Sequence, residues 1–316
     1  MSPFARAARA RAPVDHGSKR SLTHHMTVAD PTTTATRPDA LVSVEWAAEH
    51  LDDPSVRFIE VDVDTSAYET GHLPGAVGFN WVTQLNDPTK RDLVSHDELQ
   101  ALLRAAGVSD DTTIAFYGDN NNWFAAWAYW QLRYQGIEDV KLIDGGRKKI
   151  ESSGLPLTSD APGHAPGNIS VPRETRDELR IYRDEVVAGV GKPGRGLVDV
   201  RSPEEYRGEL AAPAHLPQEA AQRKGHIPGA ANVPWSTAVA EDGTFKPIAE
   251  LREIYGGKGL VADNEIVAYC RIGERSSHTW FVLSELLGYP NVRNYDGSWT
   301  EYGSLVGAPI EVGDRN

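Results

Sequence analysis

The stretch GHLPGAVGF, residues 71–79, returns as GHIPGAANV at residues 225–233. Five of the nine positions are identical, and the two copies lie 154 residues apart. A second pair of apolar runs, residues 113–117 and 266–269, follows the two copies in the same order. Because solenoid repeats recur at much shorter periods, this single long offset indicates a duplicated domain.

Apolar runs and helical patterns alternate within each copy. Residues 58–62 and 196–200 precede the two repeated stretches, and each run carries an aspartate near its end. Tryptophans at helical spacing follow residues 113–117, and apolar residues at the same spacing follow residues 266–269. Strands alternating with helices predict an α/β fold, with a mainly parallel sheet flanked by helices in each copy.

The chain divides into four predicted segments. Residues 1–40 are rich in Arg, Ala, Thr and Pro, which favours a disordered tail or a mis-assigned start over a targeting peptide. The first domain is expected over 41–150 and the second over 177–316, joined by a Pro-, Gly- and Ser-rich linker at 151–176. The second copy also carries an insertion, 208–224, which is predicted to be an ordered surface loop.

Composition limits the class of protein. The chain has 316 residues, 40% of them hydrophobic and 24% charged, which is typical of a globular protein of about two domains. A net charge of −13 argues against nucleic acids and anionic membranes as partners. The single cysteine excludes an internal disulfide and a cysteine-rich metal site, so we expect a reducing cytoplasm and no bound metal.

That cysteine, Cys270, lies between a short buried strand and a helical pattern. The turn at residues 270–276 can direct several backbone N–H groups at one point, and a helix N-terminus attracts anions. Arg271 and Arg275 add two positive charges to the same turn. We therefore predict a nucleophilic thiol whose pKa lies well below that of an ordinary cysteine.

The two copies differ at this turn. The second copy reads YCRIGER at residues 269–275, whereas the first reads YGDNNNW at residues 117–123. The thiol and both arginines are absent from the first copy, and Asp119 stands where the second has Arg271. We expect the first domain to be catalytically inactive and the second to carry the chemistry.

Three motifs together resemble the rhodanese family of sulfurtransferases. Residues 68–79 are similar to the amino-terminal signature of the family, and residues 292–302 are similar to its carboxy-terminal signature. Residues 270–275 are similar to its six-residue active-site loop. The resemblance covers residues 41–310 and implies two tandem rhodanese-like domains of the bacterial thiosulfate sulfurtransferase type.

The resemblance implies a double displacement on Cys270 that needs no cofactor. The thiolate takes the outer sulfur of thiosulfate as a persulfide and releases sulfite, and the persulfide then passes its sulfur to cyanide or another thiophilic acceptor. Glu205 occupies the position of an arginine in mammalian-type members, which makes Arg207 the nearest arginine. The implied site comprises Cys270, the substrate-binding Arg271, Ile272, Gly273, Glu274, Arg275 and Ser276, and the supporting Asp199, Arg207, Ser298 and Trp299.

Three other functions compete with this one. A cysteine phosphatase has five residues between its Cys and Arg, whereas four separate Cys270 from Arg275 here. A 3-mercaptopyruvate sulfurtransferase shares the two-domain plan, but its loop carries no charge at the position of Arg271. A sulfur carrier would deliver the persulfide to a partner protein, and an intact Cys270 loop is compatible with that role.

Overall fold

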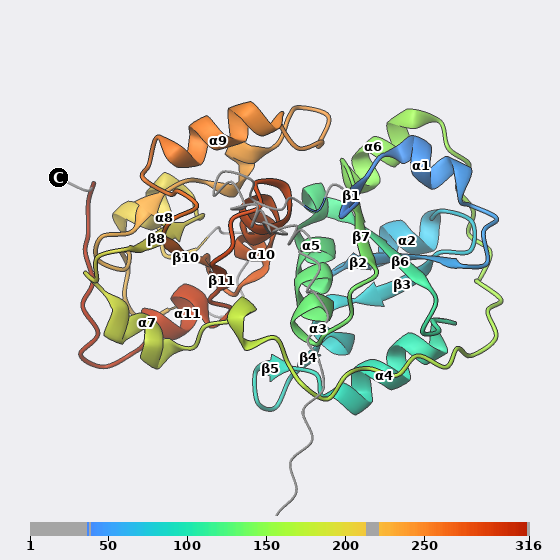
Figure 1. Ribbon diagram of the computed structural model, residues 1–316, viewed down its shortest axis with the longest axis horizontal. Helices are drawn as coiled ribbons and strands as arrows, with labels where there is room; N and C mark the ends of the chain where they lie inside the picture. Colours follow the sequence, from blue (N-terminus) through green and yellow to red (C-terminus); the bar gives the residue numbers. More distant parts are fainter. Residues whose placement is uncertain (1–36, 38, 213–220, 315–316) are drawn as a thin grey trace, which may run out of the picture. The chain divides into compact units, whose positions relative to one another are not determined.

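Two separate parallel sheets form the framework of the protein (Figure 1). The computed structural model describes residues 37, 39–212 and 221–314. The first sheet has the order β1-β7-β6-β2-β3, with β1 at Leu41–Val42, β2 at Val56–Asp62, β3 at Val77–Asn80, β6 at Thr113–Tyr117 and β7 at Val140–Ile143. The second has the order β11-β10-β8-β9, with β8 at Arg195–Asp199, β9 at Ala231–Asn232, β10 at Glu265–Tyr269 and β11 at Val292–Asn294.

Helices connect the strands in both halves, because two parallel strands can be joined only by a crossover connection, which is usually a helix. The first half, from β1 to α6, contains α1 at Val44–Glu49, α2 at Ser66–Thr70, α3 at Trp81–Gln84, α4 at His96–Ala105, α5 at Asp119–Tyr134 and α6 at Gly146–Ser153. The second half contains α7 at Arg183–Gly189, α8 at Pro203–Arg207, α9 at Ile248–Gly256, α10 at Glu274–Phe281 and α11 at Ser298–Tyr302.

Shorter elements complete the chain. A small antiparallel pair, β4 at Asn86–Asp87 and β5 at Asp92–Leu93, projects from the first half. Two 3₁₀ turns, η1 at Asp177–Leu179 and η2 at Trp235–Ala238, and a π-helical segment, η3 at Val282–Leu286, belong to the rest. The predicted α/β fold with two parallel sheets is confirmed. The helix after Cys270, α10, begins at Glu274 and includes the last three residues of the turn predicted at residues 270–276.

Alternation along the strands separates three cores. In β10, Ile266 and Ala268 point into the largest hydrophobic core, whereas Val267 and Tyr269 pack into a smaller one on the other face. Successive side chains of a strand point to opposite faces. The residue that follows Tyr269, Cys270, therefore continues the inner row and lies in the largest core.

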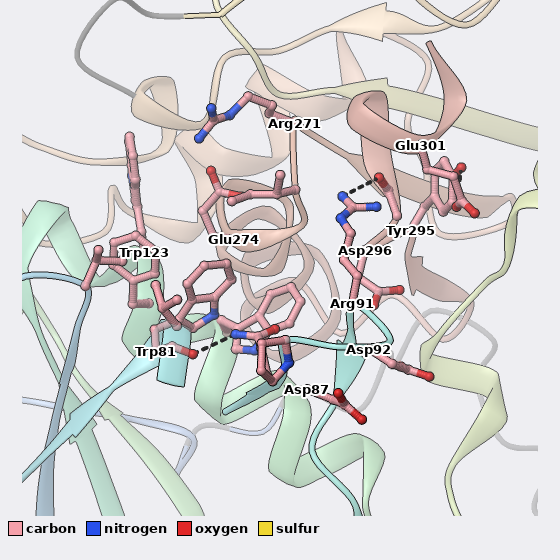
Figure 2. Close-up of a pocket in the computed structure, with 18 of the residues that line it drawn as sticks. Trp81, Asp87, Arg91, Asp92, Trp123, Arg271, Glu274, Tyr295, Asp296 and Glu301 are labelled. Atoms are coloured by element: carbon pink, nitrogen blue, oxygen red, sulfur yellow. Dashed lines mark hydrogen bonds between the residues drawn. The ribbon is translucent and has the colours of Figure 1, made fainter. Parts of the chain in front are cut away.

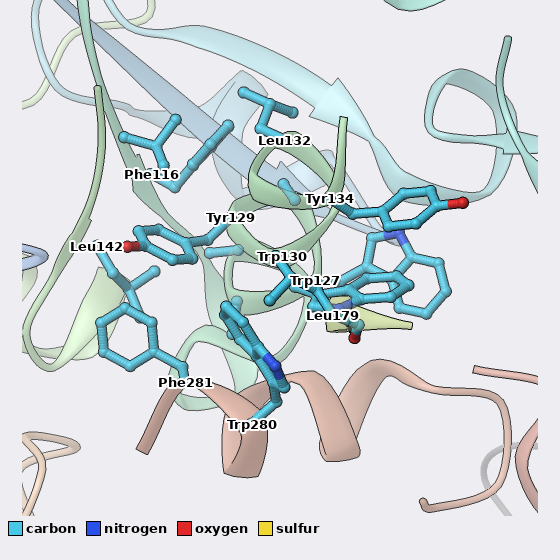
Figure 3. Packing of buried hydrophobic residues seen from close by; sticks show 14 of the residues in the cluster. Phe116, Trp127, Tyr129, Trp130, Leu132, Tyr134, Leu142, Leu179, Trp280 and Phe281 are labelled. Carbon is cyan, nitrogen blue, oxygen red and sulfur yellow. Dashed lines mark hydrogen bonds between the residues drawn. The ribbon is translucent and has the colours of Figure 1, made fainter. Parts of the chain in front are cut away.

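The largest core is shared between the two halves through α5 and α10 (Figure 3). The rings of Tyr129 on α5 and Phe281 on α10 meet edge to face with their centroids 4.8 Å apart. Trp280 lies beside them and donates its indole N–H to the carbonyl of Val292, at 2.9 Å. Burial of these aromatic side chains joins the halves through a hydrophobic interface rather than through the connecting chain alone.

The connecting chain follows the surface of the first half. Gly167 N donates to Arg104 O at 2.8 Å, and Ile169 N donates to Val108 O at 3.2 Å. Further on, Arg180 bonds both Asp92 of β5 and Asp296 of the second half, each at 2.7 Å.

Most of the 1–40 segment and residues 213–220 of the 208–224 insertion lie outside the described residues. No described helix is both long and apolar enough to cross a membrane.

Replacing Phe281 by alanine should lower the free energy of unfolding by about 3–5 kcal/mol, because the change leaves a cavity in the core that both halves share. Urea denaturation followed by tryptophan fluorescence measures this loss. Val306→Ala is the control, since Val306 is fully exposed and the change should alter the free energy by only about 0.5 kcal/mol or less. Equal losses in the two variants would contradict a shared core.

Candidate active site

Cys270 occupies the position immediately after the central strand β10. The carboxyl end of this strand lies beside that of β8, since Tyr269 pairs with Asp199 in register. Loops at the carboxyl ends of parallel strands are the usual location of binding sites in α/β sheets. The side chain of Cys270 is completely buried.

The turn after Cys270 directs backbone N–H groups at the sulfur. Gly273 N lies 3.1 Å from Cys270 Sγ and donates to it from the N-terminus of α10. Gly273 has a φ of +102°, and a β-carbon at this position would come within 2.5 Å of the Trp127 ring. Ser298, in the left-handed region with a φ of 51°, accepts a hydrogen bond from Cys270 N at 3.0 Å. The glycine and Ser298 thus fix the turn around the sulfur.

The other loop residues divide between structural and cavity-facing positions. The hydroxyls of Ser276 and Ser277 both donate to the carbonyl of Gly273, at 2.9 and 2.8 Å. Ser276 is fully buried, so its hydroxyl supports the turn. Arg271 and Ile272, in contrast, line a cavity between the halves.

A buried chain of charged groups continues from the thiol. Cys270 Sγ lies 3.2 Å from Oε2 of Glu274, and Oε1 of the same carboxylate lies 3.5 Å from Nε of Arg275. Arg275 in turn binds Glu205 through two N–H groups, at 2.9 and 3.2 Å. A bidentate guanidinium–carboxylate pair is geometrically specific. Glu205, which occupies the position of an arginine in mammalian-type members, is therefore a supporting residue.

The electrostatic prediction for the thiol is wrong in this structure. Burial is the first cause that raises the pKa of Cys270 above its ordinary value, and the adjacent carboxylate of Glu274 raises it further. Arg275 and the N–H groups of Gly273 and Ser276 oppose these effects but do not outweigh them. Desolvation penalises the charged form of any buried acid. The resting thiol is thus protonated, and no sequence pattern indicated that Glu274 would point at it.

Asp199, one of the predicted supporting residues, binds Arg201. Their side chains form a fully buried pair with contacts from 2.5 to 3.2 Å. Arg201 also donates to the carbonyl of Gly225 at 2.7 Å and lies over the ring of Trp299, 4.6 Å from its centroid. This pair supports the core beneath the site.

None of the four predicted supporting residues lines the cavity. Arg207 ends α8 with its guanidinium bound to Glu209, at 2.7 and 3.0 Å, so the structure does not bring it to the Cys270 loop. Trp299 is buried, donates its backbone N–H to the carbonyl of Cys270 at 3.0 Å, and holds the loop from behind.

The cavity beside the loop has a volume of about 700 Å³ and is lined by both halves (Figure 2). Figure 2 shows Arg271 and Glu274 on its second-half side and Trp81 and Trp123 on its first-half side. Cys270 itself does not line the cavity, but Glu274 contacts both the thiol and this space. Its charged lining consists of Asp62, Asp64, Asp87, Asp92, Asp119, Glu274, Asp296 and Glu301, with Lys90, Arg91, Arg180 and Arg271.

The first-half counterpart of the catalytic loop also borders this cavity. The strand register pairs Glu60 with Tyr117 and Asp199 with Tyr269, so Glu60, not Asp62, is the counterpart of Asp199. Residues 120–122 all adopt left-handed conformations, and the right-handed part of α5 follows them.

Among the described residues, no group of three or more His, Cys, Asp or Glu side chains could hold a metal ion.

Comparison with protein families identifies this arrangement. The rhodanese-like domain matches the chain twice, at residues 43–153 and 182–305. The chain belongs to the rhodanese family. The two tandem rhodanese-like domains and their parallel sheets are thus confirmed, and the family supports sulfurtransferase activity.

Two curated relatives match the chain over nearly their whole length. A protein of Mycolicibacterium smegmatis, named "Putative thiosulfate sulfurtransferase", is 56% identical over 277 residues, which are 88% of this chain and 99% of the relative. The "Sulfur carrier protein TtuD" of Thermus thermophilus is 54% identical over 282 residues, with 88% and 98% covered. Both the enzyme and the carrier interpretation therefore have a close relative.

Solved structures share the fold at lower identity. The anaerobic ergothioneine biosynthesis enzyme of Chlorobium limicola, in complex with its substrate trimethyl histidine, has a TM-score of 0.77 and 25% identity. The match covers 88% of this chain and 71% of that one. An EanB variant with a cysteine persulfide and ergothioneine has a TM-score of 0.78 at the same identity, with 89% and 72% covered.

Replacing Glu274 by glutamine should lower the pKa of Cys270, because a neutral amide no longer opposes formation of the thiolate. The ultraviolet absorbance of the thiolate during a pH titration measures this pKa, since Cys270 is the only cysteine and Cys270→Ser supplies the baseline. In the unmodified protein the midpoint should lie above that of a free cysteine, about 8.5.

Glu253→Gln is the matched control, because Glu253 is exposed on α9 and the change should leave the midpoint in place. A midpoint below that of a free cysteine in the unmodified protein would disprove the assignment. So would a midpoint that rises in Glu274→Gln.

Proposed function

We propose that this protein transfers the outer sulfur of thiosulfate, through a persulfide on Cys270, to a thiophilic acceptor such as cyanide or a thiol. The observation that carries the proposal is the environment of one sulfur atom. Gly273 N, at the N-terminus of α10, lies 3.1 Å from Sγ, and the Glu274 carboxylate lies 3.2 Å from it on the side of the cavity. A nucleophile, a proton acceptor and a hydrogen-bond donor that can stabilise an anion thus meet at one sulfur atom.

The first half-reaction begins with the proton of the resting thiol. Glu274 Oε2 is within hydrogen-bond reach of Sγ and takes this proton as the general base. The thiolate attacks the outer sulfur of thiosulfate, a new bond forms between the two sulfurs, and the bond to the sulfonate sulfur breaks. Sulfite leaves with the bonding electron pair, and a covalent persulfide remains on Cys270.

Stabilisation of negative charge comes from the loop itself. The Gly273 N–H and the partial positive charge at the start of α10 favour an anionic sulfur at Sγ. Arg271 lines the cavity directly after the nucleophile, where its charge can meet the sulfonate end of the substrate. Arg275 acts through others, because Glu205 occupies two of its N–H groups and Glu274 lies beside its third nitrogen.

A second function, sulfur delivery to a partner protein, is favoured by the similarity to the Thermus thermophilus sulfur carrier at 54% identity. The first half-reaction would be the same, and only the acceptor would differ. Neither version requires a metal or an organic cofactor. The two versions are separated by offering the persulfide form of the protein small acceptors and cell-derived protein fractions in parallel.

The direct test is mass measurement of the intact protein after treatment with thiosulfate. The unmodified protein should gain the mass of one sulfur atom, and addition of cyanide should remove it with formation of thiocyanate. Cys270→Ser should show no gain, because serine matches cysteine in size but forms no persulfide. A sulfur adduct on the serine variant would show that another group is the nucleophile.

Replacing Arg271 by glycine should reduce thiosulfate turnover. A lost charge-assisted contact to an anion costs about 1.5–3 kcal/mol, so kcat/KM should fall roughly ten- to a hundredfold. Turnover of 3-mercaptopyruvate, a monoanion, should fall less or rise, and Arg252→Ala on the exposed face of α9 should alter neither. Equal losses for the two substrates would mean that Arg271 tunes the thiolate and does not select thiosulfate.

A further inference from the structure

The wall of the cavity on the first-half side carries the reverse of the catalytic charge pattern. The strand registers align Glu60 with Asp199, which places Asp62 at the position of Arg201. Asp119 stands at the position of Arg271. Both aspartates line the cavity that Arg271 and Glu274 line from the other half. The inactive domain has therefore exchanged two cations for two carboxylates at a site that faces the active loop.

One of these carboxyl groups has an oxygen that receives no N–H donor. Asp62 is only 2% exposed, and its Oδ1 accepts the backbone N–H of Asp119 at 2.6 Å. Its Oδ2 is buried and receives no N–H group from the described residues, and the neighbouring carboxyl group of Glu60 shares a hydrogen bond with Asp62. Burial raises the pKa of Asp62 to about 8, so this carboxyl group is protonated at neutral pH, and a bound cation would favour its ionised form and lower that pKa. A buried carboxylate oxygen that receives no N–H donor can contact a cation.

Aromatic rings line the same cavity as the two carboxyl groups. Trp81, Trp123, Phe124 and Trp127 all line this side of the cavity, and Trp81 and Trp127 meet edge to face with centroids 5.4 Å apart. Aromatic faces next to carboxylates attract organic cations, which combine positive charge with apolar surface. We call Asp62, Asp119, Trp81, Trp123 and Trp127 the acidic aromatic wall.

The charge balance of the cavity points the same way. Eight carboxyl groups and four basic side chains line it. Among the basic ones, Arg180 already binds Asp92 and Asp296, and Lys90 lies 3.3 Å from Asp87. Near the acidic aromatic wall, Arg147 lies 4.0 Å from Asp119 but binds Glu60 and Glu151 more closely, at 2.6 and 3.0 Å. A cleft with excess negative charge concentrates cations.

The cavity is larger than thiosulfate or cyanide requires. Its volume of about 700 Å³ is in the range of sites for organic ligands, roughly 300–1,000 Å³. We propose that the acidic aromatic wall binds the cationic end of an organic thiol, and that this thiol is the acceptor of the sulfur from Cys270. The inference rests on the proposed function and names the class of its second substrate.

The transfer step balances with a thiol acceptor. The persulfide on Cys270 reacts in its protonated form. The thiolate of the acceptor attacks the terminal sulfur of this persulfide. A bond forms between these two sulfurs while the bond to Sγ breaks, and Sγ leaves with the electron pair as a thiolate. The products are the hydropersulfide of the acceptor and the free enzyme, and no external oxidant or reductant is consumed.

Three acceptors of graded charge and size test the proposal on the full-length persulfide protein. Thiocholine carries a quaternary ammonium group, 3,3-dimethylbutane-1-thiol is its neutral isostere, and cyanide is too small to reach the wall. Rates are compared at equal thiolate concentrations. The unmodified protein should use thiocholine at a kcat/KM roughly tenfold or more above that of the isostere, because a charge-assisted contact is lost in the neutral compound.

Asp119→Asn and Asp62→Asn should each reduce this preference by a similar factor, through a higher KM for thiocholine. Rates are expressed relative to cyanide in each variant, so that a general loss of activity is not counted. Asp263→Asn, at an exposed turn of the second half, is the matched control and should keep the preference. Thermal unfolding checks that Asp62→Asn folds, and Asp119→Asn, at a partly exposed position, decides the question if it does not.

Binding of choline, which has no thiol, separates the two proposals. Choline should quench tryptophan fluorescence saturably in the unmodified protein and more weakly in Asp119→Asn, whereas 3,3-dimethylbutan-1-ol should not. If thiosulfate forms no persulfide, the proposed function fails while choline binding still tests the wall. If cyanide discharges the persulfide but neither thiocholine preference nor choline binding depends on Asp62 and Asp119, the inference about the wall is overturned.

Discussion

The packing of α5 against α10 is the constraint on which the rest of the structure depends. It joins the two sheets through one hydrophobic core, with Tyr129 and Phe281 in contact at its centre. It also sets the backbone of the catalytic turn, because the Trp127 ring lies where a β-carbon of residue 273 would be. The first half therefore does more than cover the second, since its helix shapes the loop that holds the sulfur.

Burial governs the chemistry of that sulfur. Cys270 is withdrawn from solvent, so the anionic form is disfavoured until a substrate brings compensating interactions. The loop holds two opposing influences within about 3 Å of Sγ, the N–H of Gly273 and the carboxylate of Glu274. Glu274 is in turn fixed beside Arg275, whose other contacts go to Glu205. A protonated thiol beside a carboxylate is the arrangement that the proposed general-base step requires.

Duplication supplied the protein with two versions of one loop at one cavity. The second version kept Cys270 and Arg271, while the first acquired Asp119 and the left-handed residues 120–122. The first loop carries no cysteine, and its carboxylates and neighbouring tryptophans form the opposite wall of the cavity. Arg271 on one wall and Asp119 on the other suit the proposed binding of an anion at one side and of a cationic acceptor at the other.

The sequence by itself determined the duplication, the parallel α/β sheets and the position of Cys270 between a strand and a helix, because these follow from strong local signals: a repeated motif, strand and helix periodicity, and a single cysteine before a helix. It did not determine the ionisation of Cys270, which depends on burial and on the direction of the Glu274 side chain. The aspartates near the ends of the two runs suggested Asp62 as the counterpart of Asp199, whereas the strand register gives Glu60. The sequence also did not indicate that Asp199 binds Arg201 or that Arg275 binds Glu205. Arg275 and Glu205 lie 70 residues apart in the sequence, and the burial of Asp199 and Arg201 depends on the residues packed around them, so only the tertiary structure decides which charges meet.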